Sequence, residues 1–274
     1  MKPLRTISAL PTLFTLGNLV CGFYAIVVAA QIDKPDAPPS KFASPDLEYI
    51  VQSAILIFAA MLFDALDGHV ARLARTSSDF GAQLDSLCDL VSFGVAPAFL
   101  LVKMCPRFEF AHPDAVWIIA AGFACCAALR LARFNVETDE EEHLDFSGLP
   151  SPGAAGAIAG FAIMFYTLAG KAGLREPQYA EQIYKVLQTV LPFFAVLVSL
   201  LMVSRIRYPH ATNQLFRGQK SFAHIVKVIF GLVAVMVIRG YAVPLVFCFF
   251  VLASPIRYAW EKVVQRRHQE EPMF

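Results

Sequence analysis

The stretch from Asp64 to Asp89 reads DALDGHVARLARTSSDFGAQLDSLCD, and it joins two apolar segments that are each long enough to cross a membrane. Four aspartates lie inside these segments or at their edges: Asp64, Asp67, Asp85 and Asp89. A charged side chain in hydrocarbon is costly, so it is rarely kept there without a partner or a function. These four carboxylates therefore mark the candidate functional centre of the chain.

The spacing of the aspartates indicates that they lie on helix faces. Asp64 and Asp67 are three residues apart and Asp85 and Asp89 are four apart, so each pair projects from one side of a helix. Two helices joined by a short turn would bring all four carboxylates to one point. Because like charges at that distance repel, we expect a cation between them. Oxygen ligands favour hard divalent ions such as Mg²⁺ or Mn²⁺.

The composition is typical of a membrane protein. Of the 274 residues, 57% are hydrophobic and 16% are charged, whereas soluble domains carry about 25% charged residues. The predicted fold is an all-α integral membrane protein, a polytopic bundle of about eight transmembrane helices surrounded by membrane lipids. We expect the helices at 10–30, 49–72, 80–102, 115–134, 153–169, 186–204, 221–238 and 241–258.

We interpret residues 1–274 as a single transmembrane domain. Its catalytic core is expected at 10–169, with the aspartate motif at 64–89, and additional C-terminal helices at 186–258. The first apolar run is too long for the hydrophobic part of a signal peptide, so we expect it to remain as the first helix. Thr15 and Asn18 are polar residues within it, and either a side chain bonded back to its own helix or a ligand contact would explain them.

An even number of spans places both termini on one side of the membrane. The flanks on that side hold most of the 23 lysines and arginines, and the side richer in these residues is the cytoplasmic one. We therefore expect a protein integral to the cell (inner) membrane, with both termini and the active site facing the cytoplasm. The basic clusters lie between apolar runs, which suits a membrane surface, and we expect no nucleic-acid partner.

Small residues in the apolar runs indicate helix packing. None of the six cysteines forms a C-x2-C pair, which favours packing over a zinc site or a disulfide framework. Gly153, Gly156 and Gly160 lie at helical spacing, and this pattern permits close contact between helices. The pattern is better evidence for tight packing of helices than for a homodimer.

The fixed residues around the aspartates resemble a known signature. D-x2-D-G-x2-A-R-x8-G-x3-D-x3-D is the motif of the CDP-alcohol phosphatidyltransferases. All eight of its fixed positions are present here, as Asp64, Asp67, Gly68, Ala71, Arg72, Gly81, Asp85 and Asp89. The alternative is a salt-bridged polar patch with a purely structural role, but only Arg72 and Arg75 are nearby in the sequence to neutralise the four acids.

This resemblance implies a role for each motif residue. Asp64, Asp67 and Asp85 would bind a first metal ion, and Asp85 and Asp89 would help to hold a second. Asp89 would also be the base that takes the proton of the attacking alcohol. Residues with small side chains or hydrogen-bond donors would line the site for the nucleotide and the lipid phosphate, namely Gly68, Ala71, Arg72, Ser78 and Gly81.

Four further stretches resemble one branch of the family, the membrane-integral phosphatidylserine synthases. They are LPTLFTLGNLVCGF (10–23), SFGVAPA (92–98), RLARFN (130–135) and FSGLPSP (146–152). The resemblance implies CDP-diacylglycerol as donor and L-serine as acceptor. Arg130 and Arg133 would then pair with the serine carboxylate, or they would be positively charged anchors at the cytoplasmic face.

Other readings stay open at this point. A sister transferase would use glycerol phosphate, inositol phosphate or choline as its acceptor. An ion-coupled transporter also places acids in membrane helices, but it would be expected to show a repeat between its halves, and the aspartate pattern has no second copy. A phosphodiesterase-type serine synthase with H-x-K motifs is excluded, because no histidine here is followed by lysine two positions on.

Overall fold

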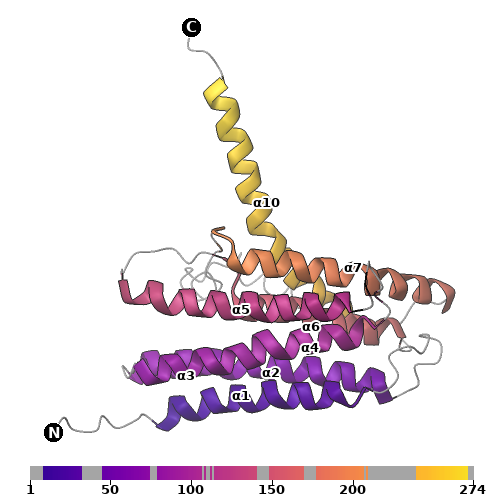
Figure 1. Ribbon diagram of the computed structural model, residues 1–274, viewed down its shortest axis with the longest axis horizontal. Helices are drawn as coiled ribbons and strands as arrows, with labels where there is room; N and C mark the ends of the chain where they lie inside the picture. Colours follow the sequence, from indigo (N-terminus) through magenta and orange to yellow (C-terminus); the bar gives the residue numbers. More distant parts are fainter. Residues whose placement is uncertain are drawn as a thin grey trace, which may run out of the picture.

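The protein is an all-helical bundle in the part of the chain that its computed structural model describes (Figure 1). The described residues are 9–32, 45–74, 79–106, 108, 112, 114–140, 148–169, 177–206, 208 and 239–270. Seven helices in these ranges are long and apolar enough to cross a membrane, which confirms the predicted polytopic bundle. The helix predicted at 221–238 lies outside the described residues.

The helices follow the order of the predicted spans. The first two are α1 (Ala9–Ala30) and α2 (Pro45–Ala74). The third span is made by three consecutive segments, α3 (Asp79–Asp89), the π-helical segment η2 (Leu90–Val95) and α4 (Ala96–Met104). After these come α5 (Ala115–Glu140), α6 (Ser151–Ala169), α7 (Pro177–Val203), the short 3-10 helix η3 (Arg239–Tyr241) and α10 (Ala242–Glu270).

Several helices are longer than the apolar runs that predict them. The apolar runs predict helices at 186–204 and 115–134, but α7 already begins at Pro177 and α5 continues to Glu140. The last predicted helix ends at residue 258, whereas α10 continues to Glu270. Hydropathy locates the part of a helix that fits the hydrocarbon of the bilayer. The backbone hydrogen bonds of a helix continue into the polar sequence outside the hydrocarbon, so the apolar runs underestimate the lengths of the helices.

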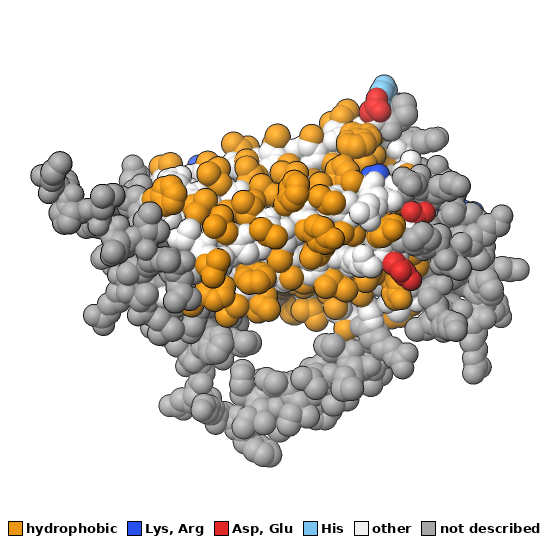
Figure 2. Space-filling view, turned by 90° about the horizontal axis from the view of Figure 1, so that it is seen from below, with side chains coloured by type: hydrophobic (Ala, Val, Ile, Leu, Met, Phe, Trp, Pro, Cys, Tyr) orange, Lys and Arg blue, Asp and Glu red, His pale blue; other side chains and the backbone are white. Residues whose placement is uncertain are grey.

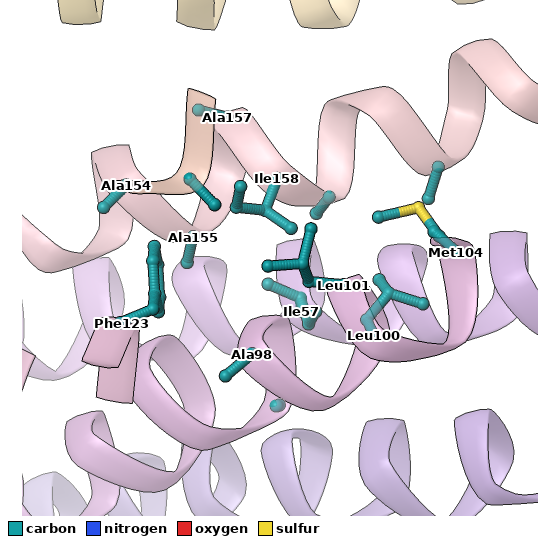
Figure 3. Packing of buried hydrophobic residues seen from close by; sticks show 14 of the residues in the cluster. Ile57, Ala98, Leu100, Leu101, Met104, Phe123, Ala154, Ala155, Ala157 and Ile158 are labelled. Atoms are coloured by element: carbon teal, nitrogen blue, oxygen red, sulfur yellow. The ribbon is translucent and has the colours of Figure 1, made fainter. Parts of the chain in front are cut away.

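The core extends from α1 to α7, and Figure 3 shows the part of it that lies between α2, α4, α5 and α6. Ile57, Leu101, Phe123 and Ile158 come from these four helices in turn, and all are fully buried. Alanines on α6 leave room for the large side chains of its neighbours, and α6 is the most enclosed of the seven spans. This packing fixes α2 and the third span, which carry the aspartates, relative to each other.

The glycines of α6 face α10 of the same chain. A Cβ atom at Gly156 would overlap the ring of Phe247, and one at Gly160 would press on the backbone of Pro244. The first residues of α10 therefore pack closely on α6, while its C-terminal part leaves the bundle (Figure 1). This confirms tight packing as the reason for the glycine spacing, and a homodimer stays a prediction.

The outer surface of the bundle is apolar. Leu13, Phe23, Ile55, Ile118 and Phe249 are each more than half exposed. Figure 2 shows hydrophobic side chains covering the middle of the face seen there. Soluble monomers rarely expose so much contiguous apolar surface, and lipid chains would cover it in a bilayer. With seven spans in its described residues, the chain is an integral membrane protein.

Candidate active site

Three of the four motif aspartates meet at one point. Carboxylate oxygens of Asp64, Asp85 and Asp89 lie within 4.8 Å of one another. Asp64 belongs to α2, whereas Asp85 and Asp89 lie one turn apart on α3, so the cluster joins the two helices of the motif. Asp89 is 7% exposed, and the other two are partly buried.

Asp67 lies at the edge of this cluster. Its Oδ2 atom accepts a hydrogen bond from the Thr15 hydroxyl group on α1, and its charge acts on both Asp64 and Asp85. The expected convergence of four carboxylates is thus seen directly for three of them. A role for Asp67 as a metal ligand stays a prediction.

The donor set of the cluster fits a hard divalent cation. Carboxylate oxygens this close repel one another unless positive charge lies between them. Arg130 on α5 is the cation that acts on Asp64 and Asp89 among the described side chains, and one guanidinium group offsets one of the three negative charges. Three carboxylates, with no sulfur or imidazole ligand in their cluster among the described residues, suit Mg²⁺ or Mn²⁺ better than a transition metal that prefers softer ligands.

Arg130 is held beside the aspartates by α6. Its Nη1 atom donates to the hydroxyl oxygen of Ser151 at 2.9 Å, and its Nε atom is buried without a hydrogen-bond partner among the described residues. Arg133, three residues further along α5, is partly buried. Of the two arginines predicted to bind the acceptor, Arg130 lies near enough to Asp64 and Asp89 for its charge to act on both.

The start of α6, which carries Ser151, is fixed by the preceding turn. Gly148 has a φ of 95°, which side chains other than glycine rarely adopt. A Cβ atom there would also overlap the carbonyl oxygen of Met202. The N–H groups of Gly148 and Leu149 donate to the carbonyl oxygens of Ile206 and Leu201, at 2.9 and 3.0 Å. Gly148 and Leu149 of the FSGLPSP stretch therefore position Ser151, and through it Arg130.

The residues expected to line the nucleotide site are described in part. Gly68 is exposed on α2, and a Cβ atom there would meet nothing within 4 Å, which agrees with open space for a ligand beside Asp67. Gly81 is partly buried in the first turn of α3. Ala71 and Arg72 belong to the end of α2, but their side chains lie outside the described part, as does all of Ser78.

A π-helical segment that the sequence did not predict lies directly after Asp89. In η2 the N–H group of Ala96 donates to the carbonyl oxygen of Val91, five residues back. Such segments are rare and frequently lie at functional sites. Pro97 was an available signal, because it has no N–H group to continue the regular helical bonds.

Two contacts from α1 were also missed. Asn18 Nδ2 donates to Asp89 Oδ1 at 2.9 Å, and Thr15 donates to Asp67. A bond back to the helix and a ligand contact are the two alternatives that the sequence offers for each residue, and neither predicts an aspartate as the partner. Their three-residue spacing on an apolar helix was the signal that they share a face.

Comparisons with known proteins agree with this geometry. Residues 8–201 match the model of the CDP-alcohol phosphatidyltransferase family. The chain is 38% identical over 170 residues to a CDP-diacylglycerol–serine O-phosphatidyltransferase of Methanocaldococcus jannaschii, a match that covers 62% of this chain and 70% of the relative. A protein of the same name from Helicobacter pylori is 31% identical over 208 residues, covering 76% of this chain and 75% of the relative.

A third relative carries a related name. It is an archaetidylserine synthase of Methanothermobacter thermautotrophicus, 32% identical over 210 residues, covering 76% of this chain and 72% of the relative. The family match extends from α1 into α7 and includes the whole aspartate cluster, whereas α10 lies beyond it. This chain therefore belongs to the CDP-alcohol phosphatidyltransferase family.

Proposed function

We propose that this protein transfers the phosphatidyl group of CDP-diacylglycerol to L-serine, giving phosphatidylserine and CMP. The observation that carries the proposal is the meeting of Asp64, Asp85 and Asp89 within 4.8 Å, on the motif of a family of phosphatidyltransferases. The names of the relatives, which include CDP-diacylglycerol–serine O-phosphatidyltransferase and archaetidylserine synthase, favour serine as the acceptor.

We expect Asp64, Asp67, Asp85 and Asp89 to hold two divalent ions, Mg²⁺ or Mn²⁺. When bound, such ions would neutralise the diphosphate of the donor and the charge of the leaving phosphate. The carboxylates would determine where the two ions lie. Asp64 and Asp67 would contribute their oxygens from α2, and Asp85 and Asp89 would contribute theirs from α3.

In the proposed reaction, the serine hydroxyl oxygen attacks the β-phosphorus of CDP-diacylglycerol directly. The new oxygen–phosphorus bond forms as the bond to the CMP oxygen breaks, and the Asp89 carboxylate takes the hydroxyl proton. A nearly buried carboxylate beside the reacting atoms suits this role, and no nucleophilic serine or cysteine is needed. If a covalent phosphatidyl-enzyme formed instead, labelled CMP would exchange into CDP-diacylglycerol in the absence of serine.

Arg130 is our candidate for binding the serine carboxylate. A serine whose hydroxyl group reaches Asp89 also brings its carboxylate into the same region. The charge of Arg130 acts on Asp89, and its guanidinium group uses one donor on Ser151, which leaves further N–H groups for a ligand. Arg133 and the rim residues Gly68, Ala71, Arg72, Ser78 and Gly81 would complete the acceptor and nucleotide sites.

The orientation of the protein is part of the proposal. Asp64 and Asp67 lie towards the C-terminal end of α2, and Asp85 lies in the adjoining α3, so the cluster is near one end of the bundle. We propose that this end faces the cytoplasm from the inner membrane, because the flanks on that side hold most of the lysines and arginines. Soluble serine and CMP would then enter and leave from the cytoplasm.

The experiment that tests the function is an acceptor panel. Purified protein in nanodiscs is given CDP-diacylglycerol, Mg²⁺ and one of L-serine, glycerol phosphate, inositol phosphate or choline, and the lipid product is identified by mass spectrometry. We expect phosphatidylserine and an equal amount of CMP with serine alone. A lipid that contains one of the other alcohols would assign the protein to a sister branch of the family.

A further inference from the structure

Two polar side chains on α1 lie outside the aspartate motif and contact two of its carboxylates. Thr15 and Asn18 are 3% and 0% exposed. Burying a hydroxyl or an amide is costly unless it forms hydrogen bonds. Thr15 donates to Asp67, and Asn18 Nδ2 donates to Asp89 Oδ1 at 2.9 Å. One face of α1 thus contacts one motif aspartate on α2, Asp67, and one on α3, Asp89.

A second bond and a close contact fix Asn18 itself. The Ser92 hydroxyl group, three residues after Asp89, donates to the backbone carbonyl oxygen of Asn18 at 3.0 Å. Gly22, one turn after Asn18, lies so close to Ser92 that a Cβ atom there would overlap its backbone. The third span is therefore held against α1 at Asp89 and again at Ser92, and this sets the register of Asn18 relative to Asp89.

Stability alone does not account for the amide at this position. The Oδ1 atom of Asn18 is buried and has no hydrogen-bond partner among the described residues. An unpaired buried acceptor destabilises the fold, and an apolar side chain of similar size would not carry this cost. The benefit of Asn18 therefore lies in the one bond that it makes, which is the bond to Asp89.

We propose that Asn18 and Thr15 are positioning residues, which hold the carboxylates of Asp89 and Asp67 in the orientation that binds the divalent ions. The inference rests on the proposed function. Clustered carboxylates repel one another, so each one tends to rotate out of the cluster. A neutral donor from α1 holds the carboxylate from outside without placing a competing positive charge among the ligands. Such outer partners commonly change metal affinity about 10- to 100-fold.

The test measures metal binding without any substrate. Full-length protein in nanodiscs is titrated with Mn²⁺, and free Mn²⁺ is followed by electron paramagnetic resonance. Asn18→Leu keeps the size of the side chain and removes its donor, and we expect it to raise the Mn²⁺ dissociation constant about 10- to 100-fold. At saturating Mn²⁺ its kcat should fall while its KM for CDP-diacylglycerol stays close to that of the wild type.

Thr15 offers a pair of variants that separates the hydroxyl group from packing. Thr15→Ser keeps the donor and should retain Mn²⁺ affinity, whereas Thr15→Val keeps the shape and should lose affinity. This pair keeps the proposal falsifiable if Asn18→Leu does not fold. Equal Mn²⁺ affinity in Thr15→Val and the wild type would overturn the role of Thr15.

Ser53→Ala is the matched control for the contact between α1 and its neighbours. The buried Ser53 hydroxyl group on α2 donates to the Ala25 carbonyl oxygen of α1 at 2.9 Å, about 10 Å along α1 from Asn18. We expect its removal to leave Mn²⁺ binding unchanged. If Ser53→Ala weakens binding as much as Asn18→Leu, or if Asn18→Leu binds Mn²⁺ normally, Asn18 only packs and the proposal is wrong. Protein that binds Mn²⁺ in this Asn18-dependent way but makes no phosphatidylserine would contradict the proposed function and support this inference.

Discussion

Asp89→Asn tests the proposed base with little change in shape. Asn18 Nδ2 donates to Asp89 Oδ1, and the carbonyl oxygen of the new amide can accept the same bond. The substitution therefore leaves the contact with α1 in place and removes the basic oxygen. A general base typically contributes about 100- to 10,000-fold to the rate, which corresponds to about 3–5 kcal/mol of transition-state stabilisation.

We expect the turnover number of Asp89→Asn to fall by that factor of about 100 to 10,000. It is measured as labelled serine incorporated into lipid at saturating Mg²⁺, and binding of CDP-diacylglycerol is measured separately and should persist. Asp114→Asn is the matched control, because the Asp114 side chain is 69% exposed. In the salt bridges of the described residues, its one partner is His112. A turnover within about tenfold of the wild type would refute Asp89 as the base.

Three further predictions address the metal, the acceptor and the packing of α10. Excess chelator should abolish transfer and added Mg²⁺ or Mn²⁺ should restore it, because three carboxylates meet within 4.8 Å; full activity in chelator would rule out the metal centre. Arg130→Ala should raise the KM for serine more than the KM for CDP-diacylglycerol, and equal changes would argue against Arg130 as the carboxylate ligand. Gly156→Ala should lower the melting temperature although alanine favours helix, because its Cβ would overlap Phe247; Gly122→Ala, where a Cβ meets nothing within 4 Å, should not.

The sequence predicted the membrane spans well and the helix ends poorly. Apolar runs locate the hydrocarbon-facing part of each helix, so seven of the predicted spans have a counterpart in the described residues. The polar first turns of α7 and the charged end of α10 carry no such signal. Their helical structure depends on backbone hydrogen bonding that continues past the membrane boundary, which hydropathy does not report.

The site was predictable where its contacts are local. Asp85 and Asp89 share a helix face by spacing alone, and Asp64 joins them because only a few residues of the chain separate the end of α2 from the start of α3. Asn18 and Asp89 are 71 residues apart, so their contact depends on the register of two packed helices. That register is set by Gly22 against Ser92 and by the π-helical segment, and neither is visible in the spacing of the motif.

A competition assay decides whether the protein transfers the phosphatidyl group to serine and whether the aspartate cluster is needed for this transfer. Purified protein receives CDP-diacylglycerol, Mg²⁺ and an equimolar mixture of L-serine, glycerol phosphate, inositol phosphate and choline, and all lipid products are quantified by mass spectrometry. We predict phosphatidylserine as the product of the wild type and no lipid product from Asp85→Ala. Transfer to another alcohol, or undiminished transfer by Asp85→Ala, would contradict this account.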